Sequence, residues 1–144
     1  DVDAMSGVDF ERFVGDLFRA RGFEVRDTQQ TADQGADVFA ERFGQQIVIQ
    51  VKNYQGSVGN SAVQQAISAR EFYSCDRAMV LTNSRFTASA ESLAESSDVR
   101  LVDRDELQSL LDDYNRWRME SGSHDAAAGP TSDAASAGGS AGSR

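Results

Sequence analysis

The chain has 144 residues, 40% of them hydrophobic, and its 14 basic and 23 acidic side chains give a formal net charge of -9. This length suits one globular domain with a core of its own, and no apolar run approaches the roughly 20 residues that a membrane-spanning helix needs. The single cysteine, Cys75, excludes an internal disulfide, and no signal-peptide pattern opens the sequence, so we expect a reducing, cytoplasmic compartment.

The charge pattern bears on the partner in two ways. A negative net charge counts against nucleic acid, because phosphate binding depends on Lys and Arg that displace counterions. However, 13 of the 14 basic residues are Arg, and abundant acidic residues accompany them. This imbalance favours a salt-adapted proteome, in which net charge says little about the partner. The only lysine is Lys52. Its ammonium group is a compact charge that can approach a bound water more closely than a broad, planar guanidinium can.

Residues 6 to 21 are predicted to form the first helix. Ser6 is a suitable N-cap and Gly22 a suitable terminator, and the apolar residues follow helical spacing: Phe10, Phe13, Val14, Leu17 and Phe18. Glu11 lies beside this apolar stripe, and two interpretations are open. It is either a solvated residue that the helix dipole favours in the first turns, or a residue whose side chain leans towards a site on the strands. Residues 23 to 26 then form a first short strand.

Residues 31 to 52 are predicted to form a loop, a strand, a tight reversal and a second strand. With a two-residue reversal at Phe43 and Gly44, the numbers of cross-strand partners sum to 87. Asp37 then lies opposite Gln50, with Cβ atoms about 5 Å apart. Gln50 and Lys52 share one face of the second strand, because side chains alternate across a pleat. A longer loop or a bulge would shift this register by one residue.

The rest of the ordered chain alternates helices and strands. A helix capped by Asn60 or Ser61 runs to about Phe72, residues 77 to 82 form a buried parallel strand, and a helix follows from Thr87 to about Ser96. Residues 99 to 102 form the last strand, and Asp103 with Glu106 caps a final helix whose apolar side carries Leu107, Leu110, Leu111, Tyr114 and Trp117. We therefore expect one domain over residues 1–120, followed by a disordered Gly/Ala/Ser-rich tail over residues 121–144.

Several common catalytic patterns are missing from the sequence. The only histidine, His124, lies in the predicted tail, so no Ser-His-Asp or Cys-His arrangement is available. The sequence also contains no GxxxxGK[ST], no GxGxxG and no CxxC. Hydrolysis by a nucleophilic side chain, nucleotide binding and zinc binding are therefore unsupported.

The chain resembles the catalytic domain of Mrr-type restriction endonucleases, in the PD-(D/E)xK nuclease superfamily. The stretches that carry the resemblance are MSGVDFERFVGDLFRARGFEV, TADQGADVFAE, IVIQVKNYQGSVGNSAVQQA, RAMVLTNSRFTASAESLAE and VRLVDRDEL. They cover residues 5 to about 111. The resemblance implies an α/β fold, a three-layer α/β/α sandwich with a central mixed sheet and the order α-β-β-β-α-β-α-β-α.

The resemblance also implies metal-dependent hydrolysis of DNA. Asp37 would bind Mg²⁺, with Mn²⁺ as an alternative, together with the main-chain carbonyl of Val51. Lys52 would orient the attacking water and offset charge on the phosphate. Gln50 replaces the carboxylate usual in the superfamily but matches the Mrr-type pattern, and its amide oxygen can still ligate a metal. Glu11 is an outer member of the site by the same resemblance.

Three functions remain open from sequence alone. The first is a restriction-type DNA endonuclease, with modified DNA as the substrate class that the family suggests. The second is a nuclease like the Holliday-junction resolvases, and the third is a nuclease-like module that only binds DNA or another protein. Asp37 and Lys52 also fit a plain cross-strand salt bridge. Cutting both strands of a duplex favours a homodimer, for which the face from Leu107 to Trp117 is a candidate, and Mrr-type enzymes usually carry a separate DNA-recognition domain.

Overall fold

A computed structural model describes residues 3, 5–30 and 35–125. Over these residues the elements follow the predicted order, with one helix, three strands, and then alternating helices and strands. Their bounds are α1 (Gly7–Ala20), β1 (Glu24–Gln30), β2 (Gly35–Arg42), β3 (Gln45–Lys52), α2 (Asn60–Phe72), β4 (Arg77–Thr82), α3 (Ala88–Ser97), β5 (Val99–Val102) and α4 (Arg104–Asp125).

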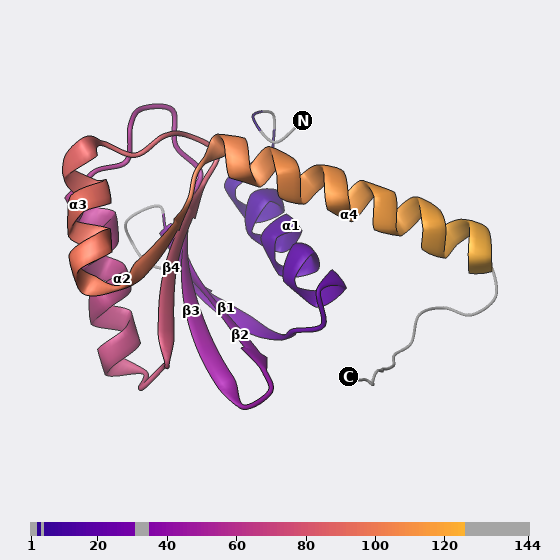
Figure 1. Ribbon diagram of the computed structural model, residues 1–144, viewed down its shortest axis with the longest axis horizontal. Coiled ribbons are helices and arrows are strands. Elements are labelled where there is room, and N and C mark those ends of the chain that lie inside the picture. Colours follow the sequence, from indigo (N-terminus) through magenta and orange to yellow (C-terminus); the bar gives the residue numbers. More distant parts are fainter. Residues whose placement is uncertain (1–2, 4, 31–34, 126–144) are drawn as a thin grey trace. The chain divides into compact units, whose positions relative to one another are not determined.

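The strands form one mixed sheet in the order β1-β2-β3-β4-β5. The β1–β2 and β2–β3 pairs are antiparallel, whereas β3–β4 and β4–β5 are parallel because a helix connects the strands of each pair. Helices α2 and α3 cover one face of the sheet and α1 covers the other (Figure 1). The predicted three-layer α/β/α sandwich is therefore confirmed.

Helix α1 begins and ends where the sequence predicts. The Ser6 hydroxyl oxygen accepts a hydrogen bond from the Asp9 amide at 3.1 Å, which satisfies one of the unpaired N–H groups of the first turn. Gly22 follows the helix with φ of +92°, a left-handed conformation that glycine adopts without steric cost. The apolar stripe packs on the sheet, where Gly15 lies next to Val25 of β1. This contact places α1 on the face to which Val25, Ala40 and Val38 belong.

The opposite face carries the core that supports the candidate site. Small residues on the inner side of α2 allow this helix to approach β3 and β4 closely. The buried cluster consists of Phe39, Val48, Val58, Ala62, Val63, Ala66, Ala69, Cys75, Ala78, Val80, Ala90, Ala94 and Val99. Phe39 and Val48 are cross-strand partners. Asp37 lies two residues before Phe39 and Gln50 two residues after Val48, so both point to the same face.

Some element ends differ from the prediction. Strand β1 continues to Gln30 rather than Arg26, because it pairs with β2 across an irregularity between Arg26 and Gln29. Helix α2 has Gly59 as its N-cap, without a side-chain hydrogen bond, instead of Asn60 or Ser61. Thr87 is the N-cap of α3 and not its first residue.

The start of the last helix agrees with the prediction. The Asp103 carboxylate accepts hydrogen bonds from the amides of Asp105 at 3.0 Å and Glu106 at 3.1 Å, as a cap does. The chain divides into two compact units, Asp1–Leu110 and Leu111–Arg144, and α4 belongs to both. Residue 120, where the sequence predicts the domain to end, lies within α4, and residues 126–144 of the predicted tail lie outside the described residues. The domain boundary stays a prediction. Within the described part of the chain, no helix has the length and apolar character needed to cross a membrane.

Candidate active site

The β2–β3 hairpin sets the register of the candidate site. Phe43 and Gly44 form its turn with φ of 55° and 80°, and two successive left-handed residues are the signature of a type I′ turn. This tight turn fixes the pairing along both strands, from Arg42 opposite Gln45 to Gly35 opposite Lys52. Asp37 lies opposite Gln50. The predicted register is therefore confirmed, without the one-residue shift that a longer loop would have caused.

Asp37 and Gln50 form a buried polar pair in the middle of the sheet. Asp37 is 6% exposed and Gln50 is 3% exposed. The Gln50 amide nitrogen Nε2 donates a hydrogen bond of 2.5 Å to Asp37 Oδ1. Because the amide nitrogen is used in this way, the oxygen Oε1 is the atom of Gln50 with which a cation would interact.

Lys52 lies two residues beyond Gln50, on the same face of β3. Its side chain is half-buried, and its neighbours in the sheet are Gly35 on β2 and Thr82 on β4. The positive charge of Lys52 lowers the pKa of Asp37, so the two groups lie within electrostatic reach of each other. The structure thus brings together Asp37, Gln50 and Lys52, three of the four predicted site side chains.

Burial raises the pKa of the Asp37 carboxyl above its ordinary value. Two smaller effects oppose burial, namely the hydrogen bond from Gln50 and the charge of Lys52. An ionised carboxylate in this position is therefore only partly compensated by the protein, and a cation would favour its charged form. A raised pKa in a buried carboxyl group is a feature of functional sites.

The raised pKa predicts how stability depends on pH in metal-free buffer. The folded protein holds a proton on Asp37 at pH values where the unfolded chain has lost it, so stability falls as the pH rises from the unfolded pKa through the folded one. Asp37→Asn removes this loss and should raise the free energy of unfolding at pH 7, with a gain that shrinks as the pH falls towards 4. Urea denaturation in EDTA between pH 4 and 8 measures the difference. The control Glu41→Gln changes an exposed acid of the same strand and should show no such gain; a destabilised Asp37→Asn protein would contradict the argument.

The main chain at the end of β3 is fixed by Thr82. The Thr82 hydroxyl donates a hydrogen bond of 2.7 Å to the Lys52 carbonyl, which therefore points towards β4. Successive carbonyl groups of a strand point to opposite sides. The Val51 carbonyl accordingly points towards β2, the strand that carries Asp37.

Glu11 lies in a different layer of the sandwich. It is a half-buried residue of α1, which covers the face of the sheet opposite α2 and α3 (Figure 1). Gln50 and Lys52 belong to the face covered by α2 and α3. The start of α1 is tied to the end of β3, since Asn53 Nδ2 donates to the Met5 carbonyl at 3.2 Å. The outer role predicted for Glu11 stays a prediction.

A network of buried amide and hydroxyl groups lies directly beyond Lys52, and the sequence did not identify it as part of the site. Thr82 and Asn83 are 0% and 6% exposed. Asn83 Oδ1 accepts from the Tyr54 amide at 2.8 Å, and Asn83 Nδ2 donates to Asn53 Oδ1 at 3.0 Å. The available signal was the placement of polar residues at the carboxyl end of a buried parallel strand, where ligand sites of α/β folds gather.

The candidate donor set for a cation is made of oxygen atoms with one negative charge. It comprises the Asp37 carboxylate, the Gln50 amide oxygen and the Val51 carbonyl, which are ligands that suit Mg²⁺ together with water. Among the described residues, no three His, Cys, Asp or Glu side chains are grouped so that they could hold a metal ion. A cation at this site would therefore depend on neutral oxygen donors as well as on Asp37.

Three solved structures show the same fold. The protein of unknown function AF1548 has a TM-score of 0.66 and 20% identity over 76% of this chain and 67% of its own. The DNA modification-dependent restriction endonuclease AspBHI has a TM-score of 0.58 and 20% identity, with 83% of this chain and 36% of its own covered. The complex of EndoMS with double-stranded DNA has a TM-score of 0.51 and 19% identity, over 69% of this chain and 45% of its own.

The chain thus spans less than half of AspBHI and of EndoMS. No curated protein has a significantly similar sequence. The Mrr catalytic-domain model, described as restriction endonuclease, matches residues 2–111. This match covers the whole sheet and the helices α1, α2 and α3. The chain therefore belongs to the Mrr restriction endonuclease family.

Proposed function

We propose that the chain is a metal-dependent DNA endonuclease that hydrolyses phosphodiester bonds. The observation that carries the proposal is the convergence of a buried acid, an amide and an ammonium group from β2 and β3 in a member of the Mrr family. A structural neighbour, EndoMS, has been solved with double-stranded DNA, which supports a DNA duplex as the ligand.

Asp37, Gln50 and Val51 are proposed to hold the divalent cation. The raised pKa of Asp37 supports this role, because a buried carboxylate without enough compensating charge favours a cation. A bound Mg²⁺ or Mn²⁺ would supply Lewis-acid chemistry at the phosphate. Gln50 keeps the Asp37 carboxylate oriented through its amide nitrogen and offers its oxygen to the cation.

Lys52 is proposed to orient the attacking water and to stabilise the negative charge that grows on the phosphate during the reaction. An ammonium group on a half-buried stem can approach the reacting oxygens more closely than a guanidinium. Thr82 holds the Lys52 carbonyl and so fixes the point from which this side chain starts.

The wider setting of the proposed enzyme follows from the same resemblance. We propose that it acts in the cytoplasm, with modified DNA as one substrate class, and as a homodimer, since cutting a duplex on both strands needs two sites. A separate DNA-recognition domain or subunit would then set the sequence specificity. A second candidate function is a nuclease-like module that binds DNA without cutting it. It is favoured by the neutral Gln50, which replaces the carboxylate usual in the superfamily.

The test is a cleavage assay with purified protein and supercoiled, linear, methylated and four-way-junction DNA. We expect cleavage with Mg²⁺ or Mn²⁺ and none with EDTA. A strong preference for junctions would replace the restriction-type assignment with the resolvase-like one. If the protein binds DNA but does not cleave it at any metal concentration, the chain is a nuclease-like binding module. If it neither binds nor cleaves DNA, the proposed function is rejected.

A further inference from the structure

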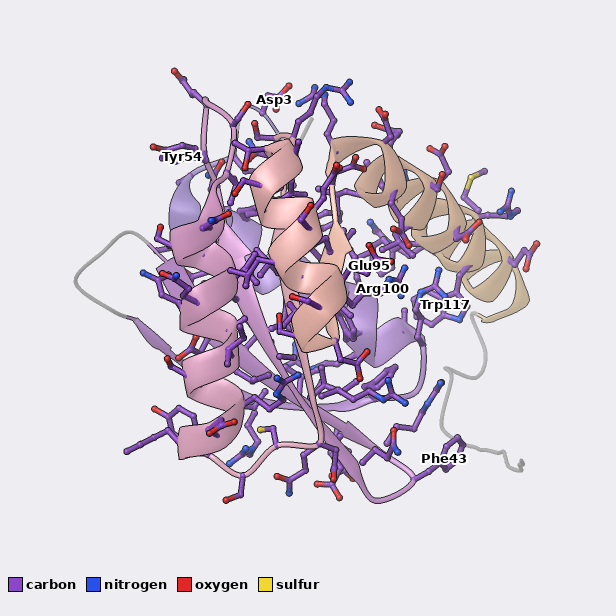
Figure 2. All side chains as sticks on the ribbon, turned by 60° about the vertical axis from the view of Figure 1, so that its left-hand side comes forward. Asp3, Phe43, Tyr54, Glu95, Arg100 and Trp117 are labelled. Atoms are coloured by element: carbon purple, nitrogen blue, oxygen red, sulfur yellow. The ribbon has the colours of Figure 1, made fainter. Side chains whose placement is uncertain are left out.

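We infer that the loop after Lys52 is a rigid platform that holds the Tyr54 ring against a nucleotide beside the scissile phosphate. This inference rests on the proposed function, because it assumes that DNA reaches Lys52. The loop covers residues 53–59 and lies at the carboxyl end of β3. Figure 2 shows Tyr54 at the same end of the molecule as Asp3, whereas Phe43 lies at the other end of the hairpin.

Hydrogen bonds join this loop to the segment over residues 83–87, which follows β4. The Tyr54 amide donates to Asn83 Oδ1 at 2.8 Å, and the Ser84 hydroxyl donates to the Gly56 carbonyl at 2.6 Å. Further along, the Val58 amide donates to the Arg85 carbonyl at 2.8 Å. The two segments therefore form one hydrogen-bonded unit rather than two independent loops.

Asn83 is the centre of this unit and is itself held on several sides. Its Nδ2 donates to Asn53 Oδ1 at 3.0 Å, and its carbonyl accepts from Arg104 Nη1 at 2.7 Å. Arg104 in turn forms an ion pair with Asp3 at 2.5 Å. Asn83 is 6% exposed, so its own hydrogen bonds are partly shielded from water, whereas the ion pair between Arg104 and Asp3 is exposed. The main chain that carries Tyr54 is thus fixed before any ligand binds.

The Tyr54 side chain is open to solvent although its backbone is fixed. It is 48% exposed, and its ring lies against Gly56, where an added Cβ would be 3.6 Å from Tyr54 Cε2. The ring therefore has a neighbour within the loop, and nearly half of the residue is accessible to a ligand. A ring held in this way loses little conformational freedom when it binds, which favours its use as a contact surface.

The chemistry of the partner follows from the ring and from the charge of the protein. Aromatic rings stack on nucleobases of any sequence, and this contact needs no charge. With 23 acidic and 14 basic side chains, the protein carries an excess of negative charge that opposes the approach of phosphates. A neutral stacking contact two residues from Lys52 supplies affinity that salt does not screen, in keeping with an acidic, arginine-rich composition.

The experiment compares Tyr54→Ala, Tyr54→Leu and Tyr54→Phe for duplex binding and cleavage. Binding is measured by fluorescence anisotropy with Ca²⁺ between 0.1 and 1 M KCl, and cleavage with Mg²⁺. If the ring makes the contact, Ala and Leu should raise Kd and KM roughly tenfold, with kcat changed much less, and Phe should retain wild-type values. The slope of log Kd against log salt should stay the same in all three variants, because no phosphate contact is removed.

The control is Phe43→Asn, which removes an 86% exposed aromatic side chain at the hairpin turn, and it should leave Kd unchanged. Thermal unfolding of Tyr54→Ala and Tyr54→Leu separates a loss of contact from a loss of fold. Metal-dependent cleavage with unchanged Kd and KM in Tyr54→Ala would overturn this inference alone. Binding that depends on the Tyr54 ring without any cleavage would overturn the proposed function alone, and a protein that binds no DNA would overturn both.

Discussion

Lys52→Ala is expected to lower kcat for DNA cleavage by roughly 10²- to 10³-fold, the cost of removing one group that stabilises developing charge. Lys52→Arg should not restore the activity, because its guanidinium is broader than an ammonium and remains charged and planar. DNA affinity measured with Ca²⁺ should change only slightly, since one positive charge among 14 is lost. Single-turnover cleavage with saturating protein gives the rate constant directly.

The control for this prediction is Glu41→Ala, which removes an exposed charge from the same face of the hairpin and should leave kcat unchanged. Lys52 is the only lysine in the sequence, so acetylation of amines provides an independent way to remove the charge of this side chain. Acetylated wild-type protein should match Lys52→Ala, because the modification removes the charge. Full activity of either protein would show that the ammonium group takes no part in the reaction.

The register of the site was predictable because it depends on local rules. Alternation along β3 places Gln50 and Lys52 on one face, and a two-residue turn leaves a single pairing with β2. The Gly44 conformation is what such a turn demands, and Phe43 tolerates the left-handed region at the cost of strain. The site geometry within the hairpin thus depends on about 16 consecutive residues, and such local patterns can be predicted from sequence.

The parts that sequence did not predict depend on contacts between distant segments. The bonds of Asn83 connect residues about 30 positions apart, and periodicity carries no information about them. The extension of β1 to Gln30 has the same origin, since pairing with β2 and not local propensity keeps this strand extended. The raised pKa of Asp37 also required the fold, because its largest cause is burial beneath the packed layer.

Gln50→Glu is expected to destabilise the metal-free protein by about 1–3 kcal/mol and to tighten Mg²⁺ binding roughly tenfold. The substitution removes the donor that now bonds Asp37 Oδ1 at 2.5 Å and sets two buried carboxyl groups side by side. Unfolding free energy against Mg²⁺ concentration measures both effects, since a bound ligand stabilises by RT ln(1 + [L]/Kd). The control Gln46→Glu lies on the same strand and face and should leave Mg²⁺ affinity unchanged.

The charge balance of the site gives this substitution a second consequence. In the wild-type protein the charge of Lys52 partly offsets that of Asp37, so the attraction of Asp37 for a cation increases when a DNA phosphate adds negative charge. Mg²⁺ and DNA should therefore bind cooperatively, each raising the affinity of the other by the same factor. Gln50→Glu supplies the missing anion from the protein and should reduce this factor. Mg²⁺ affinity measured with and without DNA for both proteins tests the argument, and equal coupling in both would place the cation away from Gln50.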